Sequence, residues 1–260
     1  MSESVRTRSN QGVFEVTLDR PKANAIDADT SRRLGQAFAH FRDDPQLRVA
    51  IITGAGERFF CAGWDLVAAA DGEPQDADYG VGGFGGLQEL PGLNKPVIAA
   101  VNGMAVGGGF ELALSADLIV AAPHARFALP EINAGTLAEA ATVRLPRRIA
   151  WHVAMELLLL GGWLGAEQAY ARGIVNAIAP PGQLMEQARS WARTLAQGPP
   201  LVFEAIKEVA RESESMRFAE AMEAIRRRRF PAVARLYASE DQREGPRAFR
   251  DKRAPLWQGR

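Results

Sequence analysis

Cysteine and histidine are scarce in this sequence. Cys61 is the only cysteine among 260 residues, and His40, His124 and His152 are the only histidines. A single cysteine excludes an intramolecular disulfide and a zinc site built from several thiolates. Three scattered histidines are a poor basis for a multi-histidine metal site. We therefore predict no metal-ligating residues and a fold that needs no covalent cross-link.

Net charge and long hydrophobic segments are also missing. The 31 basic and 31 acidic residues cancel, so no whole-protein field that attracts nucleic acid or an anionic membrane is expected. The longest apolar candidate, residues 150–160, contains Glu156 and falls short of the about 20 residues that a membrane-spanning helix requires. Met1–Arg6 has no apolar signal core, and the basic run Arg226–Arg229 would spread around a helix. We predict a cytoplasmic protein without nucleic-acid or membrane partners.

Short apolar runs alternate with segments of helical periodicity, which predicts an α/β fold. The expected strands are Val13–Leu18, Val49–Thr53, Val97–Val101, Leu118–Ala122, Arg126–Leu129 and Ile174–Ala179. The first expected helix follows a cap at Asp27 or Asp29 and has a buried stripe at Leu34, Ala37, Phe38 and Phe41. Further helices are expected near Leu137–Arg144, Ala150–Leu160 and Ala166–Ala171. From Gly182 onward the pattern is helical only. Residues 71–92 are rich in glycine and predict either a mobile loop over a site or a disordered surface excursion.

Three consecutive glycines, Gly107–Gly109, lead into a short helical segment that carries Glu111 in its first turn. Glycine lets another molecule approach the main chain closely, and the first amides of a helix have no intrahelical partner. The positive end of the helix dipole adds to this, so the segment predicts a site for negative charge. That charge could belong to a stable phosphate or to a transient oxyanion.

The nucleotide-binding motifs are incomplete. After Gly54 and Gly56, Phe59 occupies the position of the third glycine in Gly-x-Gly-x-x-Gly, and Leu112 does so after Gly107. A P-loop ending in Gly-Lys-Ser/Thr is absent. An oxyanion hole remains, in which main-chain amides stabilise an enolate while Glu111 moves a proton or orients a water. The alternative for Glu111 is a glutamate that merely favours the helix dipole.

Four segments resemble the crotonase (enoyl-CoA hydratase/isomerase) superfamily, in family order. They are Phe60–Asp65, Lys95–Gly103, Gly107–Leu112 and Phe127–Glu131, and the resemblance extends from Val13 to Arg260. It implies a spiral of ββα units in residues 1–197, which carry the CoA-thioester site. It also implies a helical C-terminal region in residues 198–260 that forms trimers, commonly assembled as hexamers.

The resemblance assigns roles to particular residues. The oxyanion donors fall on the amides of Trp64 and Gly108, and the catalytic carboxylates on Glu111 and Glu131, which together hold one water. One glutamate deprotonates this water and the other delivers or takes the α-proton. The coenzyme A arm would pass Lys22, Ala23, Ala25, Ala62, Asp65 and Leu66, while Phe249 and Lys252 would reach the nucleotide, often on a neighbouring subunit. No permanently bound cofactor is implied, since coenzyme A is part of the substrate.

The implied reaction is the reversible addition of water across the α,β double bond of an enoyl-CoA thioester. Within the superfamily, several segments most resemble the carnitinyl-CoA dehydratase (crotonobetainyl-CoA hydratase) subfamily: Asp19–Asp27, Arg42–Gln46, Ala62–Asp65, Ser239–Asp241 and Glu244–Pro246. A quaternary ammonium on the acyl group would require an aromatic face. Phe84 and Trp163 are the predicted candidates.

Two departures from the family pattern leave alternatives open. The segment after Glu131 lacks the usual proline and glycine pair, and Glu139 adds a third acid there. With Glu131, it would suit an enoyl- or dienoyl-CoA isomerase, whereas the simpler interpretation is a helix residue that faces solvent. Val67 stands where many relatives carry a lysine toward the coenzyme A phosphates. An inactive acyl-CoA-binding or RNA-associated scaffold is the non-enzymatic alternative.

Overall fold

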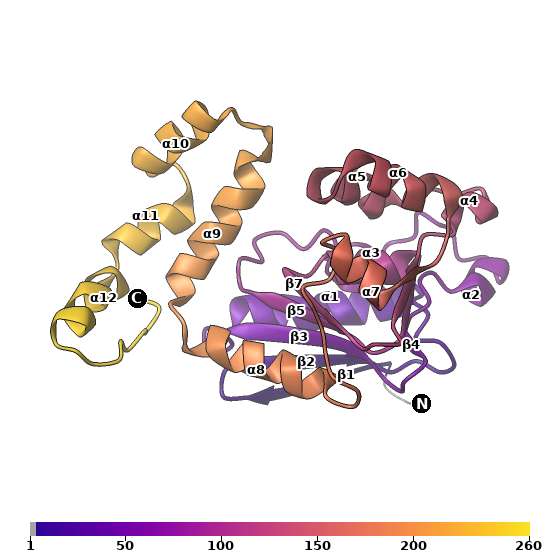
Figure 1. Ribbon diagram of the computed structural model, residues 1–260, viewed down its shortest axis with the longest axis horizontal. Coiled ribbons are helices and arrows are strands. Elements are labelled where there is room, and N and C mark those ends of the chain that lie inside the picture. The colour runs from indigo at the N-terminus through magenta and orange to yellow at the C-terminus, as the bar shows by residue number, and fades with distance from the viewer. Residues whose placement is uncertain (1–3) are drawn as a thin grey trace.

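The computed structural model describes residues 4–260, and it contains two β-sheets with helices on both sides (Figure 1). Residues 1–3, which belong to the segment predicted to have no signal core, lie outside the described residues. Within residues 4–260, no helix is both long and apolar enough to cross a membrane.

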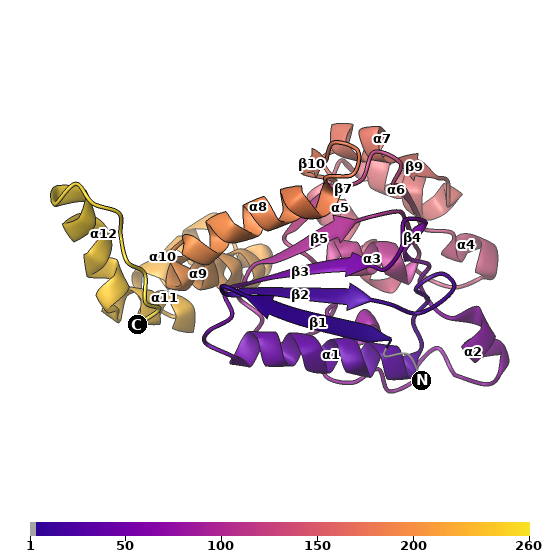
Figure 2. The same cartoon turned by 90° about the horizontal axis from the view of Figure 1, so that it is seen from below.

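The larger sheet has six strands in the order β1-β2-β3-β5-β7-β10. β1 pairs antiparallel with β2, and all other neighbours run parallel (Figure 2). The strands are β1 (Val5–Asn10), β2 (Val13–Leu18), β3 (Val49–Gly54), β5 (Val97–Val101), β7 (Leu118–Ala121) and β10 (Ala177–Ile178). The central strands are buried on both faces, which explains their continuous apolar sequences.

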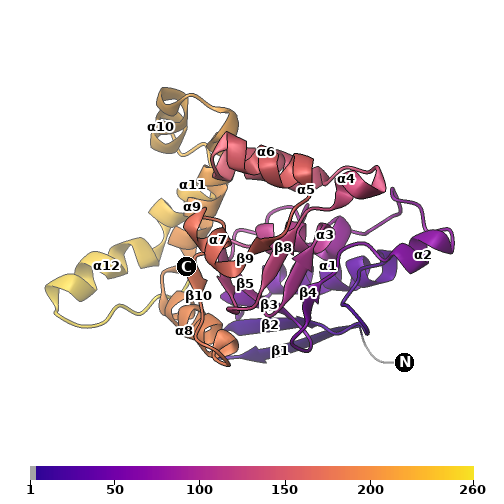
Figure 3. The same cartoon turned by 45° about the vertical axis from the view of Figure 1, so that its right-hand side comes forward.

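The smaller sheet has the order β4-β6-β8-β9 and lies beside the first (Figure 3). β4, β6 and β8 are parallel, and β9 runs antiparallel to β8. Its strands are β4 (Phe59–Cys61), β6 (Met104–Val106), β8 (Arg126–Ala128) and β9 (Leu164–Gly165). β4, β6 and β8 have three residues each, too few for a period-two pattern to identify them from sequence.

One unit repeats three times along the chain. A strand of the larger sheet is followed by a strand of the smaller sheet and then by a helix. The three units are β3-β4-α2, β5-β6-α3 and β7-β8-α4, with α2 at Leu66–Ala70, α3 at Gly108–Leu114 and α4 at Glu131–Ala134. Because equivalent strands are neighbours in each sheet, the chain advances as a spiral of ββα turns, as the resemblance implied.

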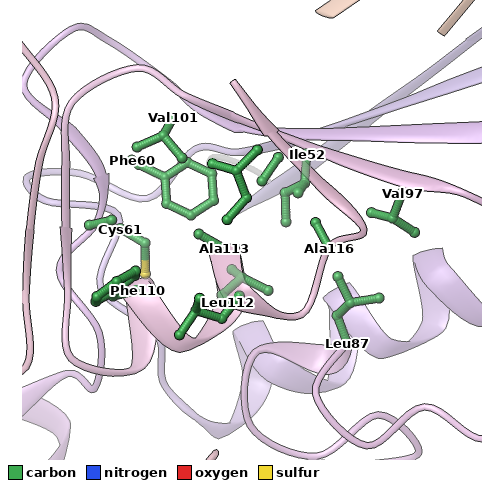
Figure 4. Packing of buried hydrophobic residues seen from close by; sticks show 14 of the residues in the cluster. Ile52, Phe60, Cys61, Leu87, Val97, Val101, Phe110, Leu112, Ala113 and Ala116 are labelled. Carbon is green, nitrogen blue, oxygen red and sulfur yellow. The ribbon is translucent and has the colours of Figure 1, made fainter. Parts of the chain in front are cut away.

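The core lies on both faces of the larger sheet. On β3, Ala50 and Ile52 join the cluster that α1 (Ala28–Asp43) and α3 cover, whereas Val49 and Ile51 join the cluster under α8 (Leu184–Gln197). This alternation follows from the opposite directions of successive side chains on a strand. Figure 4 shows the first cluster, in which α3 side chains face residues of both sheets, and its labelled members include Ile52, Phe60, Cys61, Phe110 and Leu112.

The remaining helices cover one end of the sheets and then extend away from them (Figure 1). They are α5 (Glu139–Arg148), α6 (Trp151–Leu160), α7 (Ala166–Ala171), α9 (Pro200–Glu212), α10 (Phe218–Arg226), α11 (Pro231–Ala238) and α12 (Glu240–Arg250), with 3-10 turns η1 (Phe84–Gly86) and η2 (Ser213–Ser215). Helices α9–α11 share a small buried cluster of their own around Phe230 and Val233. The predicted division at residue 197 falls between α8 and α9 and stays a prediction.

The α/β class and most predicted elements are confirmed. Asp27 caps α1 by accepting from the Thr30 amide at 2.8 Å, and Leu34, Phe38 and Phe41 are fully buried. The predicted helix at Leu137–Arg144 instead begins at Glu139 and continues to Arg148, with Pro146 inside it. The predicted strand at Ile174–Ala179 is shorter, because only Ala177 and Ile178 pair with β7.

The glycine-rich segment 71–92 is no surface excursion in its second half. Gly85, Gly86 and Leu87 are buried, and the segment packs on α1. A Cβ at Gly86 would lie 2.2 Å from the Gly35 nitrogen, so only glycine permits this approach. The buried part of the segment therefore packs between α1 and α3. The predicted mobility of the segment stays a prediction.

Candidate active site

The main site residues follow equivalent strands of three successive ββα units. Trp64 lies three residues after β4, Gly108 two residues after β6, and Glu131 three residues after β8. Because β4, β6 and β8 are parallel neighbours, the segments that follow them meet at one edge of the smaller sheet. The sequence predicted these residues far apart in the chain, and the structure brings them together.

Close main-chain packing joins the segment after β4 to the start of α3. A Cβ at Gly63 would lie 2.6 Å from the Val106 carbonyl oxygen and 3.0 Å from the Gly108 nitrogen. A Cβ at Gly109 would lie 2.2 Å from the Cys61 carbonyl oxygen. Gly63 also has φ +84°, which disfavours any other residue. Glycine at these positions therefore lets two strand ends touch.

The amides of Trp64 and Gly108 are free to bind a ligand. Ile26 pairs with the Trp64 segment through the Gly63 carbonyl and the Asp65 amide, which leaves the amide between them unused. Gly108 is the first residue of α3, where an amide has no intrahelical acceptor. Within residues 4–260, neither of the two amides donates a hydrogen bond. They form a pair of unsatisfied donors beside one cavity.

That cavity has a volume of about 400 Å³. Its lining includes the predicted oxyanion and acid–base residues, Trp64, Gly108, Glu111 and Glu131. The other lining residues are Gln75, Tyr79, Phe84, Gln88, Glu89, Thr136, Leu137, Glu139, Ala140, Val143 and Arg144. The site is therefore enclosed by the segment after β4, the wall of residues 75–89, α3 and the stretch from α4 to α5.

Glu111 lies on the first turn of α3 and is 7% exposed. Its Oε1 accepts a hydrogen bond from the Ala141 amide on α5 at 2.8 Å. Burial raises the pKa of the Glu111 carboxyl, while the amides of Ala141 and Ala140 and the charge of Arg144 oppose this rise. Two amide donors and a cation thus favour an ionised Glu111 in a site that would otherwise neutralise it.

Glu131 opens α4 and places its carboxylate against Gly107. A Cβ at Gly107 would lie 2.6 Å from Glu131 Oε1, and Glu131 Oε2 is buried without a hydrogen-bond partner among residues 4–260. Burial raises the pKa of Glu131 to about 7, and the negative charge of Glu111 adds to the rise. The two glutamates therefore share one cavity, in which burial raises the pKa of each carboxyl.

The predicted third acid, Glu139, also lines this cavity although its side chain is partly open to solvent. It is exposed and also lines the cavity, so its position fits both the predicted solvent-facing residue and the predicted third acid. Of the two predicted aromatic side chains, Phe84 lines the cavity: a Cβ at Gly108 would lie 2.3 Å from its ring. Trp163 is not among the lining residues and stacks instead with Arg126, whose Cζ lies 4.6 Å from the ring centre.

The predicted coenzyme A segments lie side by side. The Ala62 amide donates to the Ala23 carbonyl at 3.1 Å, and the Arg20 guanidinium bridges Asp27 and Asp65. Asp65 also caps α2 by accepting from the Val67 amide at 2.9 Å, so this carboxylate is already engaged. One edge beside the amides of Trp64 and Gly108 is therefore formed by the main chains around Lys22, Ala23, Ala25, Ala62 and Leu66.

Phe249 and Lys252 lie apart from this edge. Phe249, on α12, is 88% exposed, and Lys252 follows directly after this helix. In all three views α12 is at the opposite end of the molecule from α2 (Figures 1–3). Within one chain the structure does not bring these two residues to the site.

Several lining residues were not predicted from sequence. Tyr79 stacks edge-on against Phe84 with ring centres 5.3 Å apart, and Gln75 Nε2 donates to Thr136 Oγ1 at 2.7 Å across the cavity mouth. Arg144 closes the cavity from α5. Gln75 and Thr136 lie 61 residues apart in the chain, so no local spacing identifies their contact. Among residues 4–260, no group of three His, Cys, Asp or Glu side chains could hold a metal ion.

Known proteins resemble this chain over its whole length. The family model for enoyl-CoA hydratase/isomerase matches residues 8–260. A carnitinyl-CoA dehydratase of Salmonella arizonae is 54% identical over 263 residues, which covers 100% of both chains. An enoyl-CoA hydratase of Mycobacterium marinum has a crystal structure with a TM-score of 0.89 and 39% identity, covering 99% of both chains. A carnitinyl-CoA hydratase of Mycobacterium avium gives a TM-score of 0.78 and 36% identity, covering 100% of both chains.

These similarities confirm the predicted fold class and the predicted class of enzyme. Identity above one half over the full length, together with near-complete superposition on solved hydratases, leaves no role for the inactive-scaffold alternative. The chain belongs to the enoyl-CoA hydratase/isomerase family.

Proposed function

We propose that this enoyl-CoA hydratase/dehydratase uses Glu111 and Glu131 as its acid–base pair and the amides of Trp64 and Gly108 as its oxyanion hole. The observation that carries the proposal is their convergence on one cavity of about 400 Å³. The two free amides lie at strand ends whose main chains touch, so they are pre-oriented before substrate arrives. Such preorganised donors stabilise charge that develops during the reaction.

The two carboxylates take different roles because their surroundings differ. Glu111 accepts from a main-chain amide and feels the charge of Arg144, so it is the ionised base. Glu131 has a pKa of about 7 and an unpartnered buried oxygen, so it is the proton donor near neutral pH. Activity then requires one proton on the pair, held by Glu131 in the hydration direction.

Hydration proceeds by balanced steps. Glu111 removes a proton from the bound water, and the resulting hydroxyl bonds to the β-carbon. The double-bond electrons move toward the thioester oxygen, where the amides of Trp64 and Gly108 stabilise the enolate. Glu131 gives its proton to the α-carbon, and a proton passes from Glu111 through solvent back to Glu131. Dehydration is the reverse sequence, in which water leaves the β-carbon.

The acyl group is proposed to carry a positive charge. Relatives at 54% identity are named for carnitinyl-CoA, whose acyl chain ends in a quaternary ammonium. In this chain Glu89 and Glu139 line the cavity, and neither forms an ion pair among residues 4–260. Tyr79 and Phe84 supply aromatic surfaces on the same wall. Carboxylates and aromatic faces are the groups that favour such a cation.

Isomerisation is a second candidate activity, favoured by the position of Glu139. This acid lines the cavity together with Glu131, and two acids beside one substrate can move a proton between carbons. A 3-enoyl-CoA distinguishes the two activities. Formation of the 2-enoyl isomer without gain of water would identify an isomerase.

Oligomer formation is proposed for the C-terminal helices. Phe218 and Phe249 are 83% and 88% exposed, which is unusual for aromatic side chains. We propose that residues 198–260 form a trimer or a dimer of trimers, and that Phe249 and Lys252 reach the coenzyme A of a neighbouring subunit. We also propose that the enzyme needs no cofactor beyond the coenzyme A of its substrate.

A panel of acyl-CoA thioesters tests the proposed function. Crotonobetainyl-CoA and crotonyl-CoA differ by the quaternary ammonium, and mass detection reports whether one water is gained. Water addition to both, with the higher kcat/KM for the cationic thioester, is expected. Absence of hydration for every enoyl-CoA would overturn the proposed reaction, and preference for crotonyl-CoA would overturn only the proposed acyl group.

A further inference from the structure

Arg144 connects three elements around the base Glu111. Its guanidinium donates to Ser115 Oγ at 2.7 Å and to the Gln88 carbonyl at 2.6 Å. Ser115 Oγ in turn donates to the Glu111 carbonyl at 2.9 Å. One buried side chain therefore ties α5 to the end of α3 and to the wall of residues 75–89.

The Glu111 carboxylate depends on the same helix. Its amide donor is Ala141, which lies three residues before Arg144 on α5. Residues three apart are neighbours on the same face of a helix. A shift of α5 relative to α3 would move Ala141 and Glu111 apart. Arg144 opposes that shift, because it contacts α3 from α5.

Arg148 offers an internal comparison one turn further along α5. Its guanidinium donates to the Leu114 carbonyl at 2.5 Å, so it also holds the C-terminal end of α3. Cations are favoured there by the carbonyls and the helix dipole. Arg148, however, does not line the active-site cavity, whereas Arg144 does. The two arginines share a structural task and differ in their access to the site.

We propose that Arg144 is a positioning residue, which fixes the Ala141 amide on the Glu111 carboxylate and adds a positive charge beside the base. The inference rests on the proposed role of Glu111. The charged groups that face Glu111 are Arg144 and Glu139 on α5 and Glu131 on α4, and Glu89 lies across the same cavity. Arg144 is the single cation among them, and its charge acts with the amides of Ala141 and Ala140 to favour the ionised form of Glu111.

Arg144→Met and Arg144→Lys test this role, with Arg148→Met as the matched control. In Arg144→Met we expect kcat to fall about 10- to 100-fold, because a misplacement of about 1 Å can cost about 100-fold. KM should change by less than about twofold, since Arg144 donates its hydrogen bonds to protein atoms and not to coenzyme A. The acidic limb of kcat/KM should move to higher pH, because the Arg144 charge lowers the pKa of Glu111 and its loss therefore raises that pKa. Lysine keeps the positive charge but lacks the planar guanidinium that donates to two acceptors. Arg144→Lys should therefore restore the wild-type position of the acidic limb but not the full kcat.

Arg148→Met should lower the thermal midpoint and keep both kcat per folded enzyme and the acidic limb. Equal losses of kcat in Arg144→Met and Arg148→Met, or an unchanged acidic limb in Arg144→Met, would overturn the proposal. If Arg144→Met does not fold, Arg144→Lys decides: a wild-type kcat in this variant would overturn it. Failure of the proposed function itself is seen elsewhere, as full hydration by Glu111→Gln.

Discussion

The two sides of the active-site cavity are built in contrasting ways. The amide wall, residues 61–65 and 106–109, consists of touching main chains, where a Cβ at Gly109 would lie 2.2 Å from the Cys61 carbonyl oxygen. The acyl wall, formed by Tyr79, Phe84, Glu89 and Glu139, consists of side chains from η1, the residues that flank it and the first residue of α5, and Glu89 and Glu139 are open to solvent. In the connection just before Glu139, a Cβ at Gly135 would meet nothing within 4 Å.

This difference separates chemistry from selection. The proposed oxyanion hole requires donors in fixed positions, and the closely packed amide wall leaves no free volume for a larger side chain. Substrate preference depends on side chains that face a cavity, and these can be exchanged without moving a strand. We expect substitutions in the amide wall to affect every substrate equally and those in the acyl wall to affect the ratio between substrates.

Loss of the base is the largest expected effect. Glu111→Gln should lower kcat by about 100- to 10,000-fold for every enoyl-CoA, the range for a positioned general base. Binding of the thioester should change little, because glutamine has nearly the same shape. Stopped-flow hydration and calorimetric binding of a substrate analogue measure the two quantities. A variant that keeps full activity would contradict the proposed mechanism.

Distortion of the amide wall comes next. Gly63→Ala should lower kcat by about 100- to 1,000-fold, since displacement removes an oxyanion donor. Its Cβ would lie 2.6 Å from the Val106 carbonyl oxygen. Gly56→Ala is the matched control, because Gly56 has a similar φ of +80° and a Cβ there meets nothing within 4 Å. This control should cost about 1 kcal/mol of stability and leave kcat unchanged. Equal losses of kcat in both variants would show that backbone strain, not the contact, is responsible.

The pH dependence of hydration should reflect the shared proton. Burial raises the pKa of Glu131 to about 7, so kcat/KM should fall about tenfold per pH unit well above that value as the acid loses its proton. At low pH the rate should fall as Glu111 gains one. In Glu131→Gln the residual activity should lack the basic limb. If the basic limb persists in Glu131→Gln, it reports the titration of another group and contradicts the role of Glu131 as the acid.

The smallest effect is expected at the acyl wall. Glu139→Gln should raise KM for crotonobetainyl-CoA by about three- to tenfold, as expected for one partly exposed charge near a cation. The kinetics of crotonyl-CoA should stay within twofold. Glu156→Gln, a change of the same kind at an exposed position outside this cavity, serves as control. Unchanged selectivity in Glu139→Gln would remove this residue from substrate recognition.

Part of the amide wall could be predicted from the residues themselves, because its requirements are local. Gly107–Gly109 and Glu111 are marked by residue type and by their position after a buried strand, whereas the Trp64 amide was assigned only through the family resemblance. The acyl wall could not. Gln75 and Arg144 line the cavity through contacts between distant segments, Gln75 with Thr136, 61 residues away, and Arg144 with Gln88, 56 residues away. The prediction that Trp163 contributes an aromatic face to the cavity was wrong for the same reason. An aromatic ring suits a cation site, but Trp163, just before β9, stacks with Arg126 instead.

Secondary structure shows the same limit. β3 and β5 are long, apolar and buried on both faces, and both were predicted. β4 and β6 contain three residues each, and β1 is exposed at all but Val5, so neither length nor alternation identifies them. These strands form because their neighbours supply the missing hydrogen bonds, which is a tertiary effect.

The ratio of kcat/KM for crotonobetainyl-CoA to that for crotonyl-CoA, measured in the wild type, Glu111→Gln and Glu139→Gln, tests the separation of chemistry from selection most directly. Glu111→Gln should lower both values and leave their ratio unchanged, whereas Glu139→Gln should lower the ratio and leave the crotonyl-CoA value unchanged. A changed ratio in Glu111→Gln, or an equal loss for both substrates in Glu139→Gln, would contradict it.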